Sequence, residues 1–247
     1  MDLPIPDYLF GFNAAAQAAV LASIFFLIWL GAARMPTRRS ERVTTASILS
    51  VGLLGWFALA YYLGRQNVYW APNNPTVPTI QFGILVPIVI GLVLLTRSTR
   101  TARLLDALPM SWLVGVQFYR VLGGVFLVLW SDGRLPWQFA LPAGIGDIAT
   151  GILAVVVAGM LAGKASGAHS AAYAWCLFGI ADLVVAVSMG ALTSPGRTHF
   201  VALDGSNVLI SAYPLVMIPT FAVPVSIILH GVCLWKLRRF RSDTKER

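Results

Sequence analysis

The sequence predicts an all-α fold, a polytopic transmembrane bundle of seven helices. Hydrophobic residues make up 57% of the chain and charged residues only 11%, and the mean hydropathy is +0.76. Such a composition is far too apolar for a soluble domain. The apolar residues also gather into segments of roughly twenty residues, the length of a helix that crosses the hydrocarbon core. We therefore expect residues 1–247 to form a single integral membrane domain.

The apolar segments follow one another with mostly short polar connections, which places successive helices antiparallel. The last segment contains Pro214, Pro219 and Pro224. Each proline removes a backbone N–H donor, so we expect kinks or widened turns there. The predicted spans are residues 14–33, 43–64, 79–96, 112–130, 137–162, 171–191 and 213–235.

Basic residues cluster at alternate ends of these segments. Under the positive-inside rule, Lys and Arg stay on the cytoplasmic side. The pattern predicts an N-terminus outside, a C-terminus in the cytoplasm and a multi-pass protein of the cell inner (plasma) membrane. It also accounts for the net charge of +8 without a nucleic-acid partner. The predicted cytoplasmic clusters are Arg34, Arg38, Arg39 and Arg42; Arg97, Arg100 and Arg103; Lys164; and Lys236, Arg238, Arg239 and Arg241.

Three charged residues lie inside predicted spans at one depth. Arg120, Asp147 and Asp182 each fall within about 5 Å of the middle of their segment, at a helical rise of about 1.5 Å per residue. A charge in hydrocarbon is unfavourable by a few kcal/mol, so such residues turn toward protein and pair with one another. Gln117 stands three residues before Arg120 and shares its helix face. We expect these four side chains to form one polar cluster.

One guanidinium facing two carboxyls leaves one negative charge in excess when both acids ionise. Such a cluster is expected to hold an exchangeable proton. His230, about 7 Å nearer the cytoplasm by helical rise, is expected to relay that proton, because imidazole exchanges protons near neutral pH. The leading hypothesis is a proton-coupled transporter or channel for a small solute, in which Arg120 binds an anionic group or pairs with an acid. The expected partners are the lipid bilayer, protons and a small anionic or polar solute.

Two other functions stay open. In a structural or sensory seven-helix protein, the cluster only ties helices together. The segment Gly144-Ile145-Gly146-Asp147 resembles the Gly-x-Gly-Asp signature of intramembrane aspartyl proteases, the presenilin, signal-peptide-peptidase and prepilin-peptidase type. That resemblance implies two aspartates, here Asp147 and Asp182, that share a proton and activate water. In presenilin-like chains the partner acid precedes the motif and a Pro-Ala-Leu follows it. Here Asp182 comes after the motif and the chain has no Pro-Ala-Leu.

A second acidic segment, Gly179-Ile180-Ala181-Asp182, repeats the lettering of the first on a helix that runs the other way. This favours an inverted repeat that meets at the midplane. No paired His or carboxylate spacing indicates a metal, and no phosphate-binding loop is present. The sequence thus predicts no cofactor, no metal and, outside the protease resemblance, no catalytic residue. Cys176 and Cys233 are expected to act as small buried hydrophobes.

Overall fold

A computed structural model describes residues 5–73, 79–196, 199–201 and 207–245, with side chains as far as Arg239 apart from Thr96. Over that part of the chain the protein is all-helical. The long apolar segments become helices because a helix satisfies every backbone hydrogen bond within itself. The main helices are α1 (Tyr8–Arg34), α2 (Arg39–Arg65), α3 (Thr79–Arg97), α4 (Thr99–Ala107), α5 (Met110–Gly115), α6 (Val125–Ser131), α7 (Trp137–Ala162), α8 (Ala168–Thr193) and α9 (Val223–Lys245).

Among the residues described, six helical segments are each long and apolar enough to cross a membrane. The number rises to seven if the bent pair of α3 and α4, which meet at 87°, is taken as one span. The all-helical architecture that the sequence predicts is therefore confirmed over the described residues, with six or seven helices apolar enough to span a membrane. The six segments are Tyr8–Arg34, Arg39–Arg65, Met110–Ser131, Trp137–Ala162, Ala168–Thr193 and Ile218–Arg239.

The fourth span differs from the prediction of one regular α-helix over 112–130. Between α5 and α6 the backbone forms a 3₁₀ helix of nine residues, η2 (Val116–Gly124). The change accompanies close packing on α7, where a Cβ added at Gly151 would lie 2.8 Å from the backbone nitrogen of Val121. A 3₁₀ stretch of this length is uncommon, and one inside a helix often marks a functional hinge.

The last span begins later than the prediction of residue 213. Residues 213–216 form turns, and a π-helical segment, η4 (Ile218–Ala222), leads into α9. Pro219 and Pro224 each lack a backbone N–H, so the regular hydrogen-bond ladder cannot run through this stretch. The π-helical turn is the widened turn that these prolines predict.

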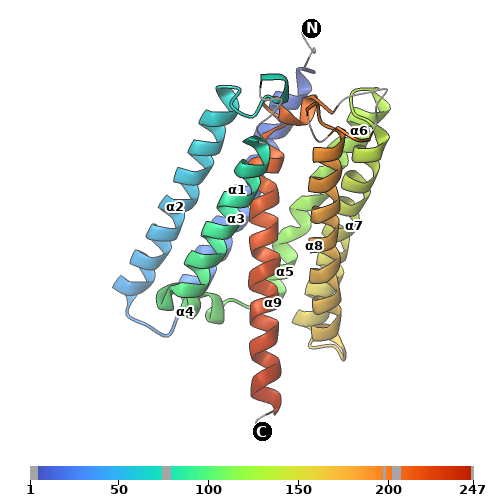
Figure 1. Ribbon diagram of the computed structural model, residues 1–247. Coiled ribbons are helices and arrows are strands. Elements are labelled where there is room, and N and C mark those ends of the chain that lie inside the picture. Colours follow the sequence, from blue (N-terminus) through green and yellow to red (C-terminus); the bar gives the residue numbers. More distant parts are fainter. Residues whose placement is uncertain (1–4, 74–78, 197–198, 202–206, 246–247) are drawn as a thin grey trace.

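Helix α9 runs through the middle of the bundle (Figure 1). It packs against α8 on one side and α3 on the other, while α7 packs against both α8 and η2. Helix α1 contacts α2, α4 and η2. The 3₁₀ segment is thereby enclosed by α1 and α7, which places Arg120 in the interior.

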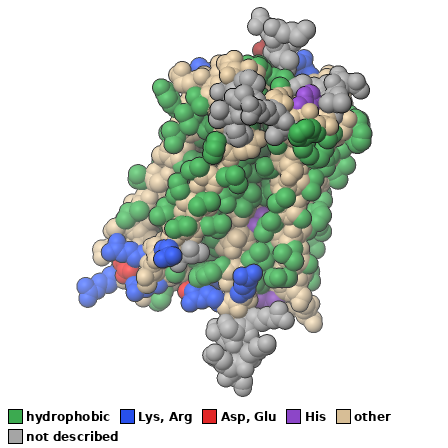
Figure 2. All heavy atoms as spheres, viewed as in Figure 1, with side chains coloured by type: hydrophobic (Ala, Val, Ile, Leu, Met, Phe, Trp, Pro, Cys, Tyr) green, Lys and Arg blue, Asp and Glu red, His purple; other side chains and the backbone are tan. Residues whose placement is uncertain are grey.

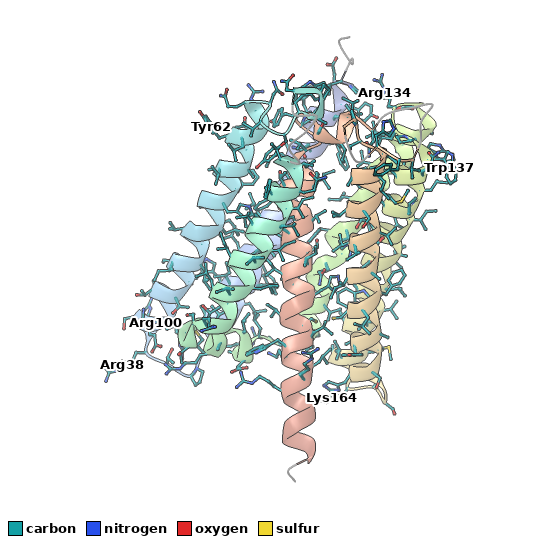
Figure 3. All side chains as sticks on the ribbon, viewed as in Figure 1. Arg38, Tyr62, Arg100, Arg134, Trp137 and Lys164 are labelled. Carbon is teal, nitrogen blue, oxygen red and sulfur yellow. The ribbon has the colours of Figure 1, made fainter. Side chains whose placement is uncertain are left out.

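Hydrophobic side chains cover the flanks of the bundle and basic side chains gather at one end (Figure 2). Large apolar residues such as Val51, Leu94 and Ile145 are more than half exposed there. An apolar belt between polar ends is the surface of a protein that lies in lipid. Figure 3 labels Arg38, Arg100 and Lys164 at one end, called here the basic end, and Tyr62, Arg134 and Trp137 at the other, called here the aromatic end.

Candidate functional site

Arg120 stands at the centre of a charged cluster drawn from four helical segments. Its Nε donates a hydrogen bond to Asp147 Oδ1 at 2.8 Å, and its Nη2 donates to the same oxygen at 2.6 Å. Nη2 also donates to Asp182 Oδ2. Nη1 donates to the Gly179 carbonyl at 3.3 Å and lies 3.3 Å from His230 Nε2. The structure thus brings together Arg120, Asp147, Asp182 and His230, here called the charged cluster.

The contact with Arg120 fixes the proton position on His230. A guanidinium has donors and no acceptor, so His230 Nε2 must accept and a neutral ring carries its proton on Nδ1. His230 is fully buried, and Nδ1 has no hydrogen-bond partner within the described residues. The ring lies against Trp175, with centroids 4.6 Å apart. His230 therefore presents an unshared N–H on the side away from Arg120.

Glycines on three helical segments make room for the cluster. A Cβ added at Gly123 would overlap Asp147, one at Gly146 would overlap Asp182, and one at Gly179 would overlap His230. Small residues let helices approach closely in lipid. A Cβ at Gly144 would lie 2.7 Å from Leu127. Both glycines of the Gly-x-Gly-Asp segment are thus required by packing in this bundle.

The three charged side chains differ in their access to free space. Arg120 is 2% exposed and Asp182 is 6% exposed, but Asp147 is 15% exposed. Asp147 lines two cavities, each with room for at least one water, which needs about 10–15 Å³. The α3–α8 cavity, of about 50 Å³, has mostly apolar walls with Gln81 and Ser194. The α1–η2 cavity, of about 40 Å³, is also lined by Gln17, Arg120 and Ser226.

The predicted neighbour Gln117 stands apart from the ion pairs. It is fully buried on η2, yet neither atom of its amide has a hydrogen-bond partner among the residues described. Thr150 Oγ1 on α7 is also buried without one. Native proteins leave few buried polar groups unsatisfied, and those few mark water, ligands or strain. The ion-pair network therefore does not include Gln117.

The structure adds residues that the sequence analysis does not single out. Helix α1 turns Asn13 and Gln17 inward, at 6% and 3% exposure. Gln17 Nε2 donates to Asn13 Oδ1 at 3.3 Å. The hydroxyls of Tyr119 and Ser226 lie 2.9 Å apart on the wall of the same α1–η2 cavity. Two amides one helical turn apart in an apolar segment are the signal that could have identified Asn13 and Gln17.

The arrangement of the two acids bears on the protease resemblance. In an aspartyl dyad, two carboxyls share a proton over a common water. Here one nitrogen of Arg120, Nη2, contacts both Asp147 and Asp182. The guanidinium already supplies the positive charge that a shared proton supplies in a dyad. The geometry is that of an ion-pair centre.

Cys176 and Cys233 are free and buried, and Cys233 Sγ lies 3.7 Å from Met110 Sδ. They pack as apolar side chains, as their sequence context predicts. Within the described ranges, no group of three or more His, Cys, Asp or Glu residues is placed to hold a metal ion.

Comparison with known families gives one match. The model of a family described as a domain of unknown function, DUF8737, matches residues 77–238. The matched region includes all four members of the charged cluster and excludes α1 and α2. Neither the curated proteins nor the solved structures contain a match to the chain.

Proposed function

The chain belongs to the DUF8737 family, and we propose that it is a proton-coupled transporter or channel for a small solute. The observation that carries this proposal is the environment of Asp147. Its side chain is 15% exposed and lines two cavities, although its partner Arg120 is almost completely buried. An ion pair that only ties helices together needs no free space beside one of its carboxylates. A pair that loads and releases a proton does.

The charge balance of the cluster supports the same proposal. Arg120 faces two carboxylates, so the group carries one negative charge when both acids are ionised. An uncompensated charge inside protein is unfavourable by several kcal/mol. A proton taken up through the cavities restores neutrality, and its release recreates the charge. Asp147 and Asp182 are the proposed carriers of this proton.

His230 is the proposed relay. Its Nε2 faces Arg120 at 3.3 Å and its Nδ1 lacks a partner within the part of the chain described. An imidazole can take a proton on one nitrogen and give one up from the other; because Arg120 keeps its own protons, Nε2 takes the proton from a carboxyl only after it leaves the guanidinium. We propose that it passes protons between the acids and the basic end of the bundle.

The broken helices are a further support. Arg120 lies on the 3₁₀ segment η2, and residues of η2 and of the π-helical segment η4 both line the α1–η2 cavity. Transporters commonly form substrate and ion sites from discontinuous helices near the midplane. Arg120 is bonded to both acids in this conformation, so an anionic solute would have to displace one of them.

The proposed topology places the basic end in the cytoplasm, with the N-terminus outside and the C-terminus inside, in the inner (plasma) membrane. The gathering of Lys and Arg side chains at one end supports it (Figure 2). Under this topology α7, which carries Asp147, and α8, which carries Asp182, cross the membrane in opposite directions, as the two halves of an inverted repeat would.

The test is a proton-flux assay in proteoliposomes that carry an internal pH-sensitive dye. Asp147→Asn and Asp182→Asn should each reduce the proton flux by tenfold or more. A side chain that transfers a proton typically contributes about 10²–10⁴-fold to the rate of a reaction. Asp106→Asn is the matched control, since Asp106 is exposed and pairs with Arg239 at the basic end, away from the charged cluster. Unchanged proton flux in both Asp147→Asn and Asp182→Asn would contradict the proposal.

A structural role is the second candidate, because a specific observation favours it. Arg120 makes contacts that use all of its N–H groups, and the surrounding glycines fit the cluster closely. If the Asn variants lose stability while native proteoliposomes show no flux above protein-free vesicles, the cluster only holds the helices together.

A further inference from the structure

The two irregular helical segments of the bundle face one cavity. Arg120 and Gly123 of η2, and Ile218 and Ala222 of η4, line the α1–η2 cavity. Irregular backbone at membrane depth is tolerated where protein buries it or where it lines a hydrated cavity. Single π-helical turns are frequent at functional sites. The backbone therefore departs from regular helix in two segments that line the same small space.

Oxygen atoms without partners point to a ligand in this space. Gln17 is 3% exposed, and its Nε2 donates a hydrogen bond to Asn13. Its Oε1 has no hydrogen-bond partner in the described part of the chain. Both hydrogen bonds from Arg120 to Asp147 end on Oδ1. No described residue donates to Asp147 Oδ2. An amide oxygen and a carboxylate oxygen thus remain without a donor from the described residues, on two side chains that line this cavity.

We propose that the α1–η2 cavity binds one small monovalent cation, Na⁺ or hydronium, with Gln17 Oε1 and Asp147 Oδ2 as its principal ligands. Hard cations take carboxylate, carbonyl and hydroxyl oxygens, and the hydroxyls of Tyr119 and Ser226 complete such a set. The volume of about 40 Å³ has room for one small cation and a water beside it. A single negative charge in excess calls for a monovalent ion.

This inference rests on the proposed function and deepens it, since it names the ion that balances the charged cluster. The α3–α8 cavity also reaches Asp147, and Gln81 on its wall has an unpartnered Oε1. Its other walls are mostly apolar, and Gln81 is less buried than Gln17. Gln81 therefore provides a matched control, with the same side chain beside the same acid in the other cavity.

The experiment measures thermal unfolding of the purified full-length protein in nanodiscs by intrinsic tryptophan fluorescence. One arm compares NaCl, KCl and choline chloride at equal ionic strength and alkaline pH. The other lowers the pH in choline chloride alone. Binding to the folded state should raise the midpoint by at least about 2 °C, in the first arm for Na⁺ and in the second for hydronium.

The rise in the unfolding midpoint should be lost in Gln17→Leu and kept in Gln81→Leu. Gln17→Glu adds a carboxylate, so it should lower the cation concentration that gives half of the maximal shift by about tenfold. If Gln17→Leu does not fold, this variant is used for the test instead. The proposal is overturned if neither the Na⁺ effect nor the proton effect depends on Gln17, or if Gln81→Leu abolishes it equally.

The two proposals fail separately. Cation binding that depends on Gln17, together with unchanged flux in Asp147→Asn and Asp182→Asn, keeps this site and removes proton-coupled transport. Flux that depends on both acids, together with no binding that depends on Gln17, keeps transport and removes this site.

Discussion

Arg120 directs two hydrogen bonds to a single oxygen of Asp147, from Nε at 2.8 Å and from Nη2 at 2.6 Å. The usual fork-to-fork pairing would engage both carboxylate oxygens. Here no described residue donates to the second oxygen, and Nη2 is shared with Asp182. Arg120 thus holds one oxygen of the Asp147 carboxylate and leaves the other without a donor, which suits a carboxylate that exchanges a proton or a cation.

Removing the arginine should destabilise the protein strongly. Arg120→Leu leaves two carboxyls facing one another in the interior without a counterion, and breaking a buried pair in this way destabilises by about 3–5 kcal/mol. Chemical unfolding in detergent measures the difference. Arg103→Leu is the control, because its 2.9 Å pair with Glu41 is exposed and contributes about 0–1 kcal/mol. Equal losses in the two variants would contradict a buried centre.

The glycines that admit the acids should not tolerate a methyl group. Gly146→Ala places a Cβ against the Asp182 carboxylate, and overpacking of this kind destabilises by about 1–3 kcal/mol. Gly159→Ala on the same helix α7 meets no atom within 4 Å and should stabilise by up to about 1 kcal/mol through helix propensity. The same unfolding measurement compares them. A neutral Gly146→Ala would mean that α7 and α8 do not pack this closely.

His230 should affect proton movement more than folding. His230→Gln keeps a side chain of similar volume beside Trp175 but removes the titrating ring, so flux in proteoliposomes should fall by about tenfold or more. The unfolding midpoint should change little by comparison. His169→Gln, on the exposed first turn of α8, serves as the control. Flux equal to that of the native protein would remove His230 from the pathway.

Lys236 should hold helix α4 in place. Its Nζ donates to the carbonyls of Leu105 at 2.7 Å and Asp106 at 3.0 Å, and also to that of Leu108. Lys236→Met leaves these carbonyls at the end of α4 without their donor, a loss of about 1–3 kcal/mol. Hydrogen exchange should then speed up in α4 and not in α7. Lys164→Met, at an exposed site, should leave both helices unchanged.

The helical architecture and the charged cluster could be predicted from residues alone, for one physical reason. Hydrocarbon penalises charge so heavily that Arg120, Asp147 and Asp182 had to be buried together, and helical rise placed them at one depth. The inward faces followed from neighbouring glycines. The bounds of α7 also match the predicted span, because Pro136 precedes the helix and Gly163 follows it.

Other features depend on contacts between distant segments. The 3₁₀ form of η2 arises where Val121 and Gly151 approach each other, and no local pattern in residues 116–124 signals it. Gln117 and Arg120 stay on one face in the 3₁₀ form, because side chains at i and i+3 eclipse there, so their spacing alone did not show that the Gln117 amide lies outside the ion pairs. Asn13 and Gln17 carry no charge, so an amide pair at the start of an apolar segment gave a weak signal. Their inward position beside the α1–η2 cavity depends on the packing of α1 against η2.

Proton coupling, as proposed, depends on one exchangeable carboxyl proton between Asp147 and Asp182. Infrared difference spectroscopy of the protein in lipid, recorded across a pH titration in H₂O and D₂O, observes such a proton through the carbonyl stretch of a protonated carboxyl. We expect one carboxyl band that titrates, shifts promptly on exchange into D₂O, and disappears in Asp147→Asn or Asp182→Asn but not in Asp106→Asn. A spectrum without a titrating band assigned to either acid, or a band that does not exchange, would contradict the account.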